Sequence, residues 1–386
     1  MIRELASTGW QRTTVKEAAD LKVTYGLPEQ ELPRGRGVIR AADISDGRLR
    51  TSPPALAAVP GAKDSRAILA EGDLVVVLVR RVGDAALIDH RHSGWVSTRS
   101  VGILRSRNRA TTRWLKIWFQ TPIARAWFDR HVSAHVEPTL SIDRLRAMEV
   151  AVPPPEQIET ITRLVELVQD KRDLNQRIAA DAVALADAHH AMLARRHEHS
   201  WTPSTFGAVA SVMTGRPGRP QPSLSGVATS RVAPADVLAA DPPYIQGGGE
   251  ETLAEPGDVC EPGTVLVASR PEGARAALTW LPTTPNRGVL AVRPSEPSDR
   301  WWLLHEIRSR SEDLPKIAQG RQAREISRRA FTRLELSWPG PEVRRRFQET
   351  VEPLHGRARL ALEENRLLEE LLDRVLRDVS SIAARI

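Results

Sequence analysis

The strongest constraint on the fold is an internal repeat with a period of about 190 residues in a chain of 386. Its clearest stretch aligns residues 140–156 with 326–342 without a gap, at an offset of 186. Earlier matches keep the same order along the chain, beginning with Trp10 and Trp201. Solenoid repeats have periods of about 20–50 residues, so this longer period indicates two related domains.

Each half has the same internal plan. A mixed region contains apolar, strand-like runs such as Leu74–Val79 and Thr264–Ala268, separated by Gly and Pro turns. Shorter helical stretches follow, at Arg113–Phe128 in the first half and Trp301–Arg310 in the second. The pattern predicts that both halves mix strands and helices in one globular domain.

A strand-like run closes each mixed region, at Glu149–Val152 and at Glu335–Trp338, and prolines follow it. Proline suits the first turn of a helix, because its missing N–H would be unpaired there. The chain after Pro155 has no Pro or Gly before Trp201, which predicts a helix about 65 Å long.

The C-terminal segment predicts a second long helix. Its apolar residues alternate spacings of three and four, which is typical of a coiled coil. The seam comprises Phe347, Val351, Leu354, Ala358, Ala361, Asn365, Leu368, Leu372, Val375, Val379, Ile382 and Ile386. Asn365 is its one polar member, and a lone Asn can fix register. Pro353 and Gly356 predict a kink or a late start of this helix.

We therefore predict an α+β protein with two similar mixed α/β domains separated by a pair of long antiparallel helices. The predicted boundaries are 1–152 and 200–340 for the domains, and 153–199 and 341–386 for the helices. An alternative is that each helix packs on its own domain or on another protein.

The charge is uneven. The chain has a formal net charge of +7. Residues 1–152 hold 24 basic and 16 acidic side chains, a net of +8, whereas residues 200–340 are nearly neutral at +1. A basic excess favours a polyanionic partner, with an inert basic surface as the alternative.

Composition also limits location and chemistry. Cys260 is the single cysteine, so neither an intramolecular disulfide nor a multi-cysteine zinc site can form. No apolar run approaches the roughly 20 residues that span a bilayer, and the N-terminus lacks a signal pattern. We expect a cytoplasmic protein that has no membrane partner.

This layout resembles the specificity (S) subunit of type I restriction–modification systems. The matching segments are Gly9-Trp10, Ala42-Asp43-Ile44, Glu71-Gly72-Asp73, Leu140-Ser141 and Val150-Ala151-Val152-Pro153-Pro154-Pro155-Glu156-Gln157 in the first half, and Gly320-Arg321-Gln322, Ile326-Ser327 and Trp338-Pro339-Gly340-Pro341-Glu342 in the second. Val343 replaces the glutamine that follows the glutamate in the first half. The resemblance covers nearly the whole chain and depends on the duplicated order.

The resemblance implies a DNA-binding subunit without catalytic residues, cofactor or metal. Each domain would be a target-recognition domain that reads one half of a split site in double-stranded DNA. The helices would fix the gap between the halves and dock two methyltransferase (M) subunits, which bind S-adenosylmethionine. Restriction (R) subunits are an optional further partner in phage defence.

Candidate contact residues follow from composition and from the helical seams. Arginine suits base and phosphate recognition because its guanidinium donates two parallel hydrogen bonds. The DNA candidates are Arg34, Arg36, Arg99, Arg105, Arg107, Arg109, Arg113, Arg216, Arg219, Arg321, Arg324 and Arg328. The partner or coiled-coil candidates are Ile161, Val165, Val168, Ile178, Leu185, Leu368, Leu372, Val375 and Val379.

Three motifs suggest other functions. Asp241-Pro242-Pro243-Tyr244 matches the tetrapeptide of adenine-specific methyltransferases, and makes a self-sufficient DNA methyltransferase the first alternative. No Gly-rich cofactor loop accompanies it. His131 and His135 have metal-ligand spacing but no third ligand. The glycines of Gly247–Gly249 precede two glutamates, which disfavours a phosphate loop.

The second alternative is a coiled-coil scaffold that does not read DNA. It is suggested by the near-neutral second domain and its acidic segment Glu250–Glu261.

Overall fold

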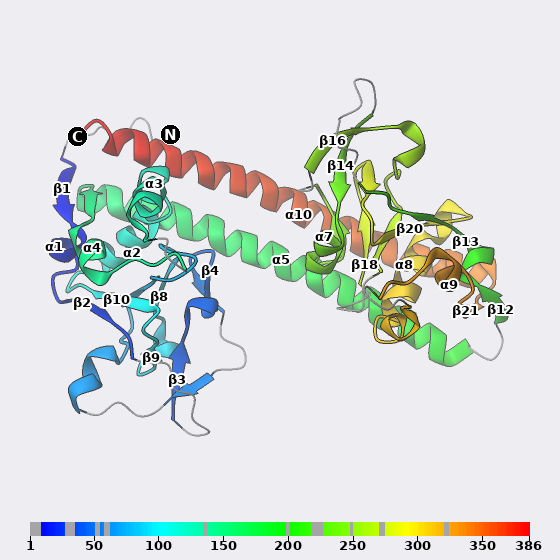
Figure 1. Ribbon diagram of the computed structural model, residues 1–386, viewed down its shortest axis with the longest axis horizontal. Helices are drawn as coiled ribbons and strands as arrows, with labels where there is room; N and C mark the ends of the chain where they lie inside the picture. Colours follow the sequence, from blue (N-terminus) through cyan, green and yellow to red (C-terminus); the bar gives the residue numbers. More distant parts are fainter. Residues whose placement is uncertain are drawn as a thin grey trace. The chain divides into compact units, whose positions relative to one another are not determined.

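The computed structural model describes most of the chain. The described residues are 9–27, 35–50, 55–57, 62–133, 137–197, 201–217, 227–247, 250–269, 275–319 and 324–386. The chain divides into two compact units: unit 1 consists of Met1–Lys171 and Arg366–Ile386, and unit 2 of Arg172–Asn365. Each unit contains part of α5 (Pro155–His197) and part of α10 (Pro341–Ala383) (Figure 1). The four segment boundaries expected from the sequence stay a prediction.

The centre of unit 1 is an antiparallel sheet in the order β2-β10-β7-β8. Its strands are β2 (Lys22–Tyr25), β7 (Leu74–Val77), β8 (Ala85–Leu87) and β10 (Val101–Arg105). Every residue of β7 is buried, because its alternate side chains enter two different apolar clusters. A continuous apolar run therefore forms a central strand here.

Two smaller sheets extend unit 1. Strand β3 (Arg36–Ile39) pairs antiparallel with β6 (Ala55–Ala57) and parallel with β9 (Val96–Ser97). Strands β4 (Ile44–Ser45) and β5 (Arg48–Leu49) form a hairpin. Both of its turn residues have positive φ, 51° at Asp46 and 74° at Gly47, as two-residue hairpin turns require.

The ends of the first domain meet in a two-stranded sheet, since β1 (Gln11–Thr14) pairs antiparallel with β11 (Glu149–Val152). The short helices of unit 1 are α1 (Val15–Ala18), α2 (Arg109–Trp118), α3 (Pro122–His131) and α4 (Ile142–Ala147). The single helix expected over Arg113–Phe128 is wrong. Two helices occur there, because α2 ends before Thr121, which caps α3 through its side chain.

Unit 2 repeats this arrangement. Its main sheet has the order β13-β20-β17-β18-β15, a second sheet has the order β16-β14-β19, and β12 pairs with β21. The strands are β12 (Thr202–Thr205), β13 (Ala210–Thr214), β14 (Val227–Val232), β15 (Tyr244–Ile245), β16 (Glu250–Ala254), β17 (Val265–Ala268), β18 (Ala276–Thr279), β19 (Thr283–Pro285), β20 (Val289–Pro294) and β21 (Glu335–Trp338).

The short helices of unit 2 are α6 (Phe206–Val209), α7 (Pro234–Ala239), α8 (Arg300–Ser309) and α9 (Arg328–Thr332). The paired first and last strands, four antiparallel central strands and the mixed three-stranded sheet thus occur in both units, and unit 2 adds β15, which pairs parallel with β18. The duplication inferred from the sequence is confirmed in the fold.

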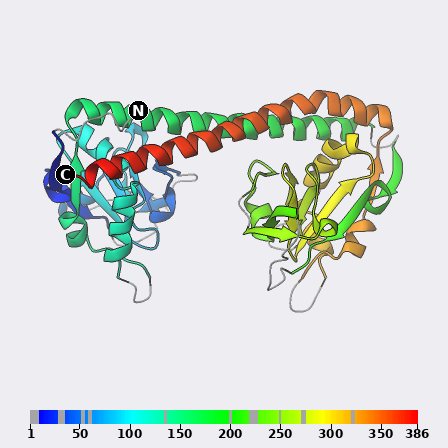
Figure 2. The ribbon, with the colours of Figure 1, turned by 90° about the horizontal axis from the view of Figure 1, so that it is seen from above.

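The long helices run antiparallel inside each unit (Figure 2). In unit 1 the N-terminal part of α5 shares a core with the C-terminal part of α10. That core includes Ile158, Ile161, Val165, Val168, Leu372, Val375, Val379 and Ile382. In unit 2 the pairing is reversed along the chain, with Ala179, Ala182, Val183 and Ala186 beside Phe347, Val351, Ala358 and Leu362. The antiparallel prediction is confirmed.

Three expectations about the helices change. Leu185 is 58% exposed and does not lie on the seam, because small residues such as Ala182 and Ala186 occupy that face of α5. Ile386 is also exposed, beyond the end of α10. A late start of α10 is wrong, since the helix begins at Pro341 and continues through Pro353.

Asn365 does lie at the helix pair. Its Nδ2 donates to the carbonyl oxygen of Arg172 on α5 at 3.1 Å. Asn175, fully buried on α5, donates to Glu364 Oε2 at 2.8 Å. These polar contacts favour one register between the helices, because a shifted register would leave buried amides unsatisfied.

Candidate nucleic-acid interface

Three of the arginines predicted to contact DNA in unit 1 are exposed: Arg99, Arg107 and Arg109. The Nε of Arg107 lies 3.8 Å from Asp20 Oδ2, and Nη1 of Arg109 donates to Glu71 Oε1 at 3.0 Å. Exposed pairs of this kind contribute little to stability, so a phosphate can replace the carboxylate at little cost. These side chains are therefore suited to contacting a nucleic-acid backbone.

Arg105 and Arg113 are held more firmly. Arg105 donates through Nε and Nη2 to the two oxygens of Asp73, both at 2.6 Å, and Asp73 is 1% exposed. Arg113 donates through Nε and Nη2 to Glu166 at 3.0 and 2.7 Å, and through Nη1 to Glu159 at 2.9 Å. Carboxylates of the protein thus occupy both guanidinium groups, and DNA contact by either arginine stays a prediction.

Arg36 lies on β3 of the three-stranded sheet. It is half-buried, and its Nη1 donates to the carbonyl oxygen of Gly94 at 2.6 Å. Its neighbour in the prediction, Arg34, lies outside the described residues, as do Arg219 and Arg321 of the second half.

The described candidates of unit 2 are also exposed. Nη1 of Arg216 lies 3.2 Å from Asp258 Oδ1, and Nε of Arg324 donates to the carbonyl oxygen of Ala318 at 3.3 Å. Arg328 is the first residue of α9. They come from two segments of the chain, since Arg216 follows β13 whereas Arg324 and Arg328 lie just before and at the start of α9, and DNA contact by these residues stays a prediction.

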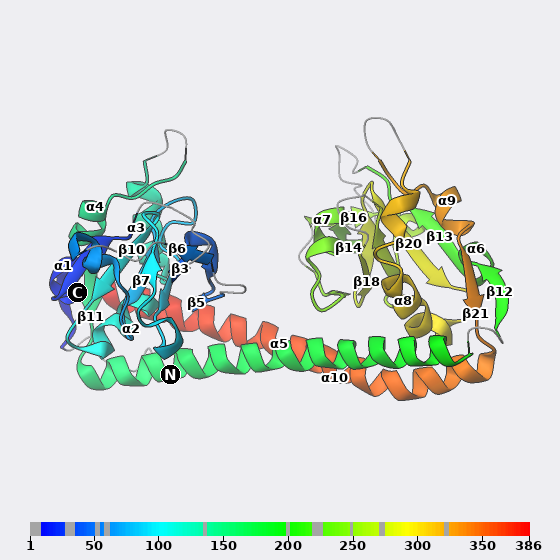
Figure 3. The same cartoon turned by 90° about the horizontal axis from the view of Figure 1, so that it is seen from below.

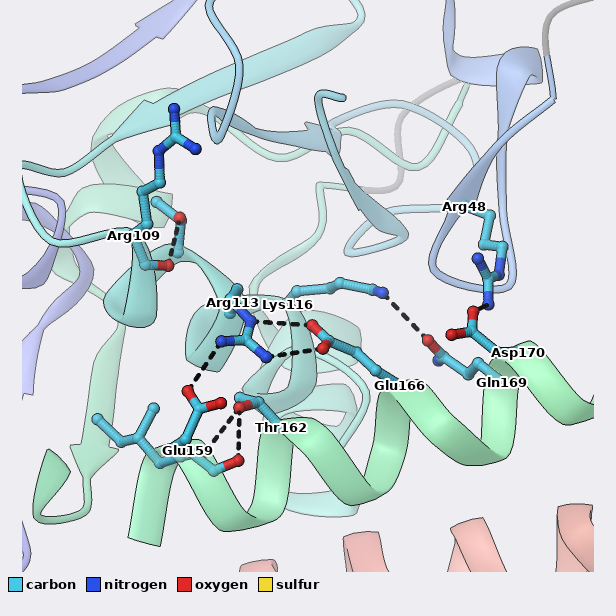
Figure 4. Close-up of polar contacts among 11 residues, drawn as sticks. Arg48, Arg109, Arg113, Lys116, Glu159, Thr162, Glu166, Gln169 and Asp170 are labelled. Carbon is cyan, nitrogen blue, oxygen red and sulfur yellow. Dashed lines mark hydrogen bonds and ion pairs between the residues drawn. The ribbon is translucent and has the colours of Figure 1, made fainter. Parts of the chain in front are cut away.

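Polar contacts between α2, the β4–β5 hairpin and α5 attach the domain of unit 1 to its long helix (Figure 4). Besides the Arg113 contacts, Nζ of Lys116 donates to Gln169 Oε1 at 3.1 Å, and Nη2 of Arg48 donates to Asp170 Oδ1 at 2.7 Å. Burial, followed by the nearby charge of Arg48, lowers the pKa of Lys116 to about 8.

In unit 2 a chain of four side chains makes the corresponding attachment, with α8 beside the long helices (Figure 3). His305 Nδ1 of α8 lies 2.6 Å from Asp187 Oδ1 of α5. His305 Nε2 lies 3.0 Å from His355 Nε2 of α10. His355 Nδ1 in turn lies 2.5 Å from the hydroxyl of Tyr244 on β15.

One proton arrangement satisfies all three contacts with both imidazoles neutral. The hydroxyl of Tyr244 donates to His355, and His355 Nε2–H donates to His305. His305 Nδ1–H then donates to the carboxylate of Asp187. An additional proton on His305 would place two N–H groups face to face across the 3.0 Å contact.

The electrostatic environment agrees with this arrangement. Burial lowers the pKa of His305 below its usual value, and burial together with the charge of His305 lowers the pKa of His355 to about 2. Burial alone would raise the pKa of Asp187, but hydrogen bonds from His305 and Arg308 hold it well below its usual value. The two imidazoles are therefore neutral at physiological pH.

Asp241-Pro242-Pro243-Tyr244 has a structural position in this chain of contacts. Tyr244 is 6% exposed, stacks on Trp280 with ring centroids 4.1 Å apart, and donates to His355. The carbonyl oxygen of Asp241 accepts a hydrogen bond from Gln176 of α5 at 2.7 Å. In this conformation the tyrosine ring is covered and cannot stack on a flipped base.

The structure describes only part of the remaining motifs. His131 stacks on Trp127 at 4.1 Å, while His135 and residues 248–249 of the glycine run lie outside the described residues. Among the described side chains, no group of three or more His, Cys, Asp or Glu residues is placed to hold a metal ion. None of the described helices is long and apolar enough to span a membrane.

Sequence reasoning missed the helix residues that attach the domains. Glu166 of α5 and Glu352 of α10 are 186 residues apart, which is the offset of the clearest repeat. Glu352 accepts hydrogen bonds from Nη2 of Arg300 at 2.6 and 2.9 Å, as Glu166 does from Arg113. Extending the ungapped alignment into the helices would have found this pair.

The sequence matches no protein-family model and no curated protein sequence. The fold, in contrast, has relatives among solved structures. It aligns with the S subunit of a type I restriction-modification system from M. genitalium at a TM-score of 0.60 and 12% identity, over 96% of each chain. The fold is that of a type I specificity subunit. The resemblance and the fold class predicted from the sequence are thereby confirmed.

Two other solved structures cover the chain at 16% identity. One comes from work on complex assembly and conformational transition of the type I R-M system, with a TM-score of 0.44 over 96% of this chain and 97% of that one. The other is the HsdS subunit from Thermoanaerobacter tengcongensis, with a TM-score of 0.35 over 97% of each chain.

Proposed function

We propose that this chain is the non-catalytic DNA-recognition subunit of a type I restriction–modification complex. It would bind a split site in double-stranded DNA and direct adenine methylation by partner subunits. The observation that carries this proposal is the specificity-subunit fold over nearly the whole chain, with two copies of one mixed α/β domain on antiparallel helices.

The charge supports DNA as the ligand. The first domain has a net charge of +8, and its exposed arginines Arg107 and Arg109 make only surface ion pairs. Phosphate contacts from such residues supply affinity that falls with salt, whereas base-edge contacts supply sequence choice. The second domain is nearly neutral, so more of its affinity would come from base contacts or from its partner subunits.

Exposed leucines support the helices as the docking surface for two methyltransferase subunits, one on each unit. On α5 of unit 2, Leu174, Leu185 and Met192 are 51%, 58% and 46% exposed. Spacings of 11 and 7 residues return to one face of a helix, so these three side chains form a stripe. In unit 1, Leu367 and Leu371 of α10 are exposed one turn apart.

S-adenosylmethionine would bind to those partners rather than to this chain, and restriction subunits would join the same complex. The complex would act on DNA in the cytoplasm. Apolar patches on an otherwise polar helix surface mark sites of protein association, which supports this assignment of the helices.

A methylation map of the host genome, with and without this gene, tests the proposal. We expect loss of methyladenine at a split motif, two short half-sites around a fixed gap. Loss at a short continuous motif would instead favour the self-sufficient methyltransferase. No change in methylation, in a host shown to express the partner methyltransferase, would contradict DNA reading and favour the scaffold.

A further inference from the structure

The two units share one type of contact between domain and long helix, in which a glutamate of the helix binds an arginine of the domain. Glu166 and Glu352 are each the twelfth residue of their helix. Arg113 lies on α2 and Arg300 on α8, at an offset of 187. Few side chains are shared by the two halves, so a pair present in both points to a requirement common to both domains.

The geometry of these pairs is directional. Arg113 forms two parallel hydrogen bonds to Glu166, and its third nitrogen reaches Glu159, which lies about two turns earlier on α5. In unit 2 the carboxylate of Glu352 receives both Arg300 and the indole Nε1–H of Trp301, the latter at 2.7 Å. Planar, paired hydrogen bonds fix orientation, because a small rotation breaks at least one of them.

The apolar contacts around these pairs do not fix orientation in the same way. In unit 1 one apolar core contains Trp114 of α2 together with Ile161 of α5, and in unit 2 Trp302 packs edge-on against Phe347 of α10, with ring centroids 5.0 Å apart. Apolar burial holds the domain on the helix, but it is non-directional. Loss of an arginine pair would therefore leave the domain folded and attached, through the apolar core and the remaining polar contacts such as Lys116–Gln169, while weakening the restriction on its rotation about the helix.

We propose that Arg113–Glu166 and Arg300–Glu352 are positioning contacts that hold each recognition domain in a single orientation on its own helix and thereby restrict the gap allowed between half-sites. This inference rests on the function proposed above. Successive base pairs are separated by about 3.4 Å and rotated by about 35°. A domain free to turn by that angle would accept a half-site displaced by one base pair.

The test is a methylation map of a host that expresses the full-length chain together with its methyltransferase partner. The broken variants are Arg113→Gln and, for the same pair, Glu166→Gln. The rescue variant is the charge swap Arg113→Glu with Glu166→Arg. The matched control is Arg125→Gln, which removes a similarly half-buried pair of 3.0 Å with Asp84, a contact within the domain.

We expect the wild type and the control to methylate one gap length only. A charged hydrogen-bonded pair of this kind corresponds to about a tenfold change in an equilibrium constant. Each broken variant should therefore raise methylation about tenfold at gaps one base pair longer or shorter, with the same half-sites, and the charge swap should reverse most of that rise.

Other results overturn the inference. Unchanged gaps in both broken variants would show that the pair has no positioning role. Weaker methylation at the original gap alone would show a contribution to stability only, and a thermal melt of each purified variant would confirm it. Absence of any split motif in the wild type would contradict the proposed function itself, and this inference with it.

Discussion

Units 1 and 2 have the same architecture but attach their domains to the long helices with different chemistry. In unit 1 the contacts are Arg113, Lys116 and Arg48, all cationic, against acidic and amide side chains of α5. In unit 2 the contacts include two neutral, buried histidines, His305 and His355, which are hydrogen-bonded to each other. One fold therefore accommodates either cationic side chains that are buried or half-buried, or a buried network of neutral imidazoles, at the same junction.

Two related domains can keep one contact to the long helix while the contacts beside it differ. The arginine–glutamate contact is kept in both halves, whereas the layer beside it has changed from Lys116 and Gln169 to imidazoles and Tyr244. Ion pairs at the surface weaken as the salt concentration rises, whereas a network of buried neutral imidazoles is destabilised when an imidazole gains a proton. The two units should therefore respond to different conditions, and the following experiments separate them.

The largest effects are expected at the tryptophans that anchor each domain. Trp114 and Trp302 are both fully buried, so replacing either with Ala should lower the free energy of unfolding by about 3–5 kcal/mol. Replacing each tryptophan with Phe distinguishes the two units, because the two indole N–H groups differ in their hydrogen bonding. Trp114 Nε1 donates to the carbonyl oxygen of Ala151 at 2.9 Å, whereas Trp302 Nε1 is buried and has no hydrogen-bond partner among the described residues.

Trp114→Phe should therefore cost about 1 kcal/mol more than Trp302→Phe, because only the first removes a hydrogen bond. Urea unfolding followed by circular dichroism measures both. Equal losses for the two Phe variants would show that the hydrogen bond of Trp114 contributes nothing to stability.

The second effect is a pH dependence confined to unit 2. The folded pKa of His355 is about 2 and the unfolded value about 6.5, so the unfolded state binds more protons below pH 6.5. Stability is then complete above that pH and falls as the pH is lowered. Between pH 7 and pH 5 the loss from His355 is about 2 kcal/mol.

His355→Gln should flatten this dependence, because an amide can donate to His305 and accept from Tyr244 without titrating. The control is His131→Gln in unit 1, a half-buried histidine whose Nδ1 contacts the carbonyl oxygen of Trp127. Urea unfolding at pH 5, 6 and 7 measures the slope. An unchanged slope in His355→Gln would exclude this residue as the source.

Lys116 of unit 1 causes a pH dependence of stability in a more basic range. Its pKa is about 8 in the folded state and about 10.4 in the unfolded state, so the unfolded state binds more protons between these two pH values. Stability from this residue should rise with pH over about 8 to 10, and urea unfolding across that range should show the rise disappear in Lys116→Met.

The third effect concerns DNA affinity. Replacing Arg99, Arg107 and Arg109 with Gln should weaken binding and reduce the slope of log affinity against log salt by about 0.9 for each phosphate that is no longer neutralised. The equivalent triple variant in unit 2 changes Arg216, Arg324 and Arg328. We expect the smaller effect from unit 2, since its domain is nearly neutral. Fluorescence anisotropy with a duplex of genomic sequence at several salt concentrations measures both; equal slopes would contradict the charge argument.

The duplicated plan could be predicted from the sequence because the strands and helices that define it depend on short stretches of the chain. Strands β11 and β21 occur at the predicted residues, and each long helix begins at a proline that follows its strand, Pro155 or Pro341. Proline placement, β-branched runs and the absence of Gly need no knowledge of distant residues.

What could not be predicted depends on contacts between distant residues. Whether Arg105 is free for DNA or bound to Asp73 is decided by how β10 pairs with β7, 32 residues away in the chain. The chain through His305 and His355 likewise needs four elements, α5, α8, α10 and β15, to meet. The position of Leu185 outside the seam could not be predicted for the same reason. Helical spacing is compatible with several buried faces of a helix, and the surface against which the helix packs decides which of them is buried.

We expect the smallest effect on stability at Leu185. A variant at this position also separates an effect on partner binding from an effect on folding. Its side chain is 58% exposed on α5, so Leu185→Glu should change the free energy of unfolding by no more than about 0.5 kcal/mol. The same change places a charge in the centre of the stripe proposed to bind a methyltransferase subunit, where an unpaired buried carboxylate is costly.

The matched control is Leu281→Glu, a leucine of the same unit that is 43% exposed and lies between β18 and β19. Co-purification of each variant with the tagged methyltransferase measures binding, and urea unfolding measures stability. We expect Leu185→Glu to lose the partner while Leu281→Glu retains it. Because both variants keep the fold, equal binding would show that this face of α5 is not a docking surface, whatever the function of the recognition domains.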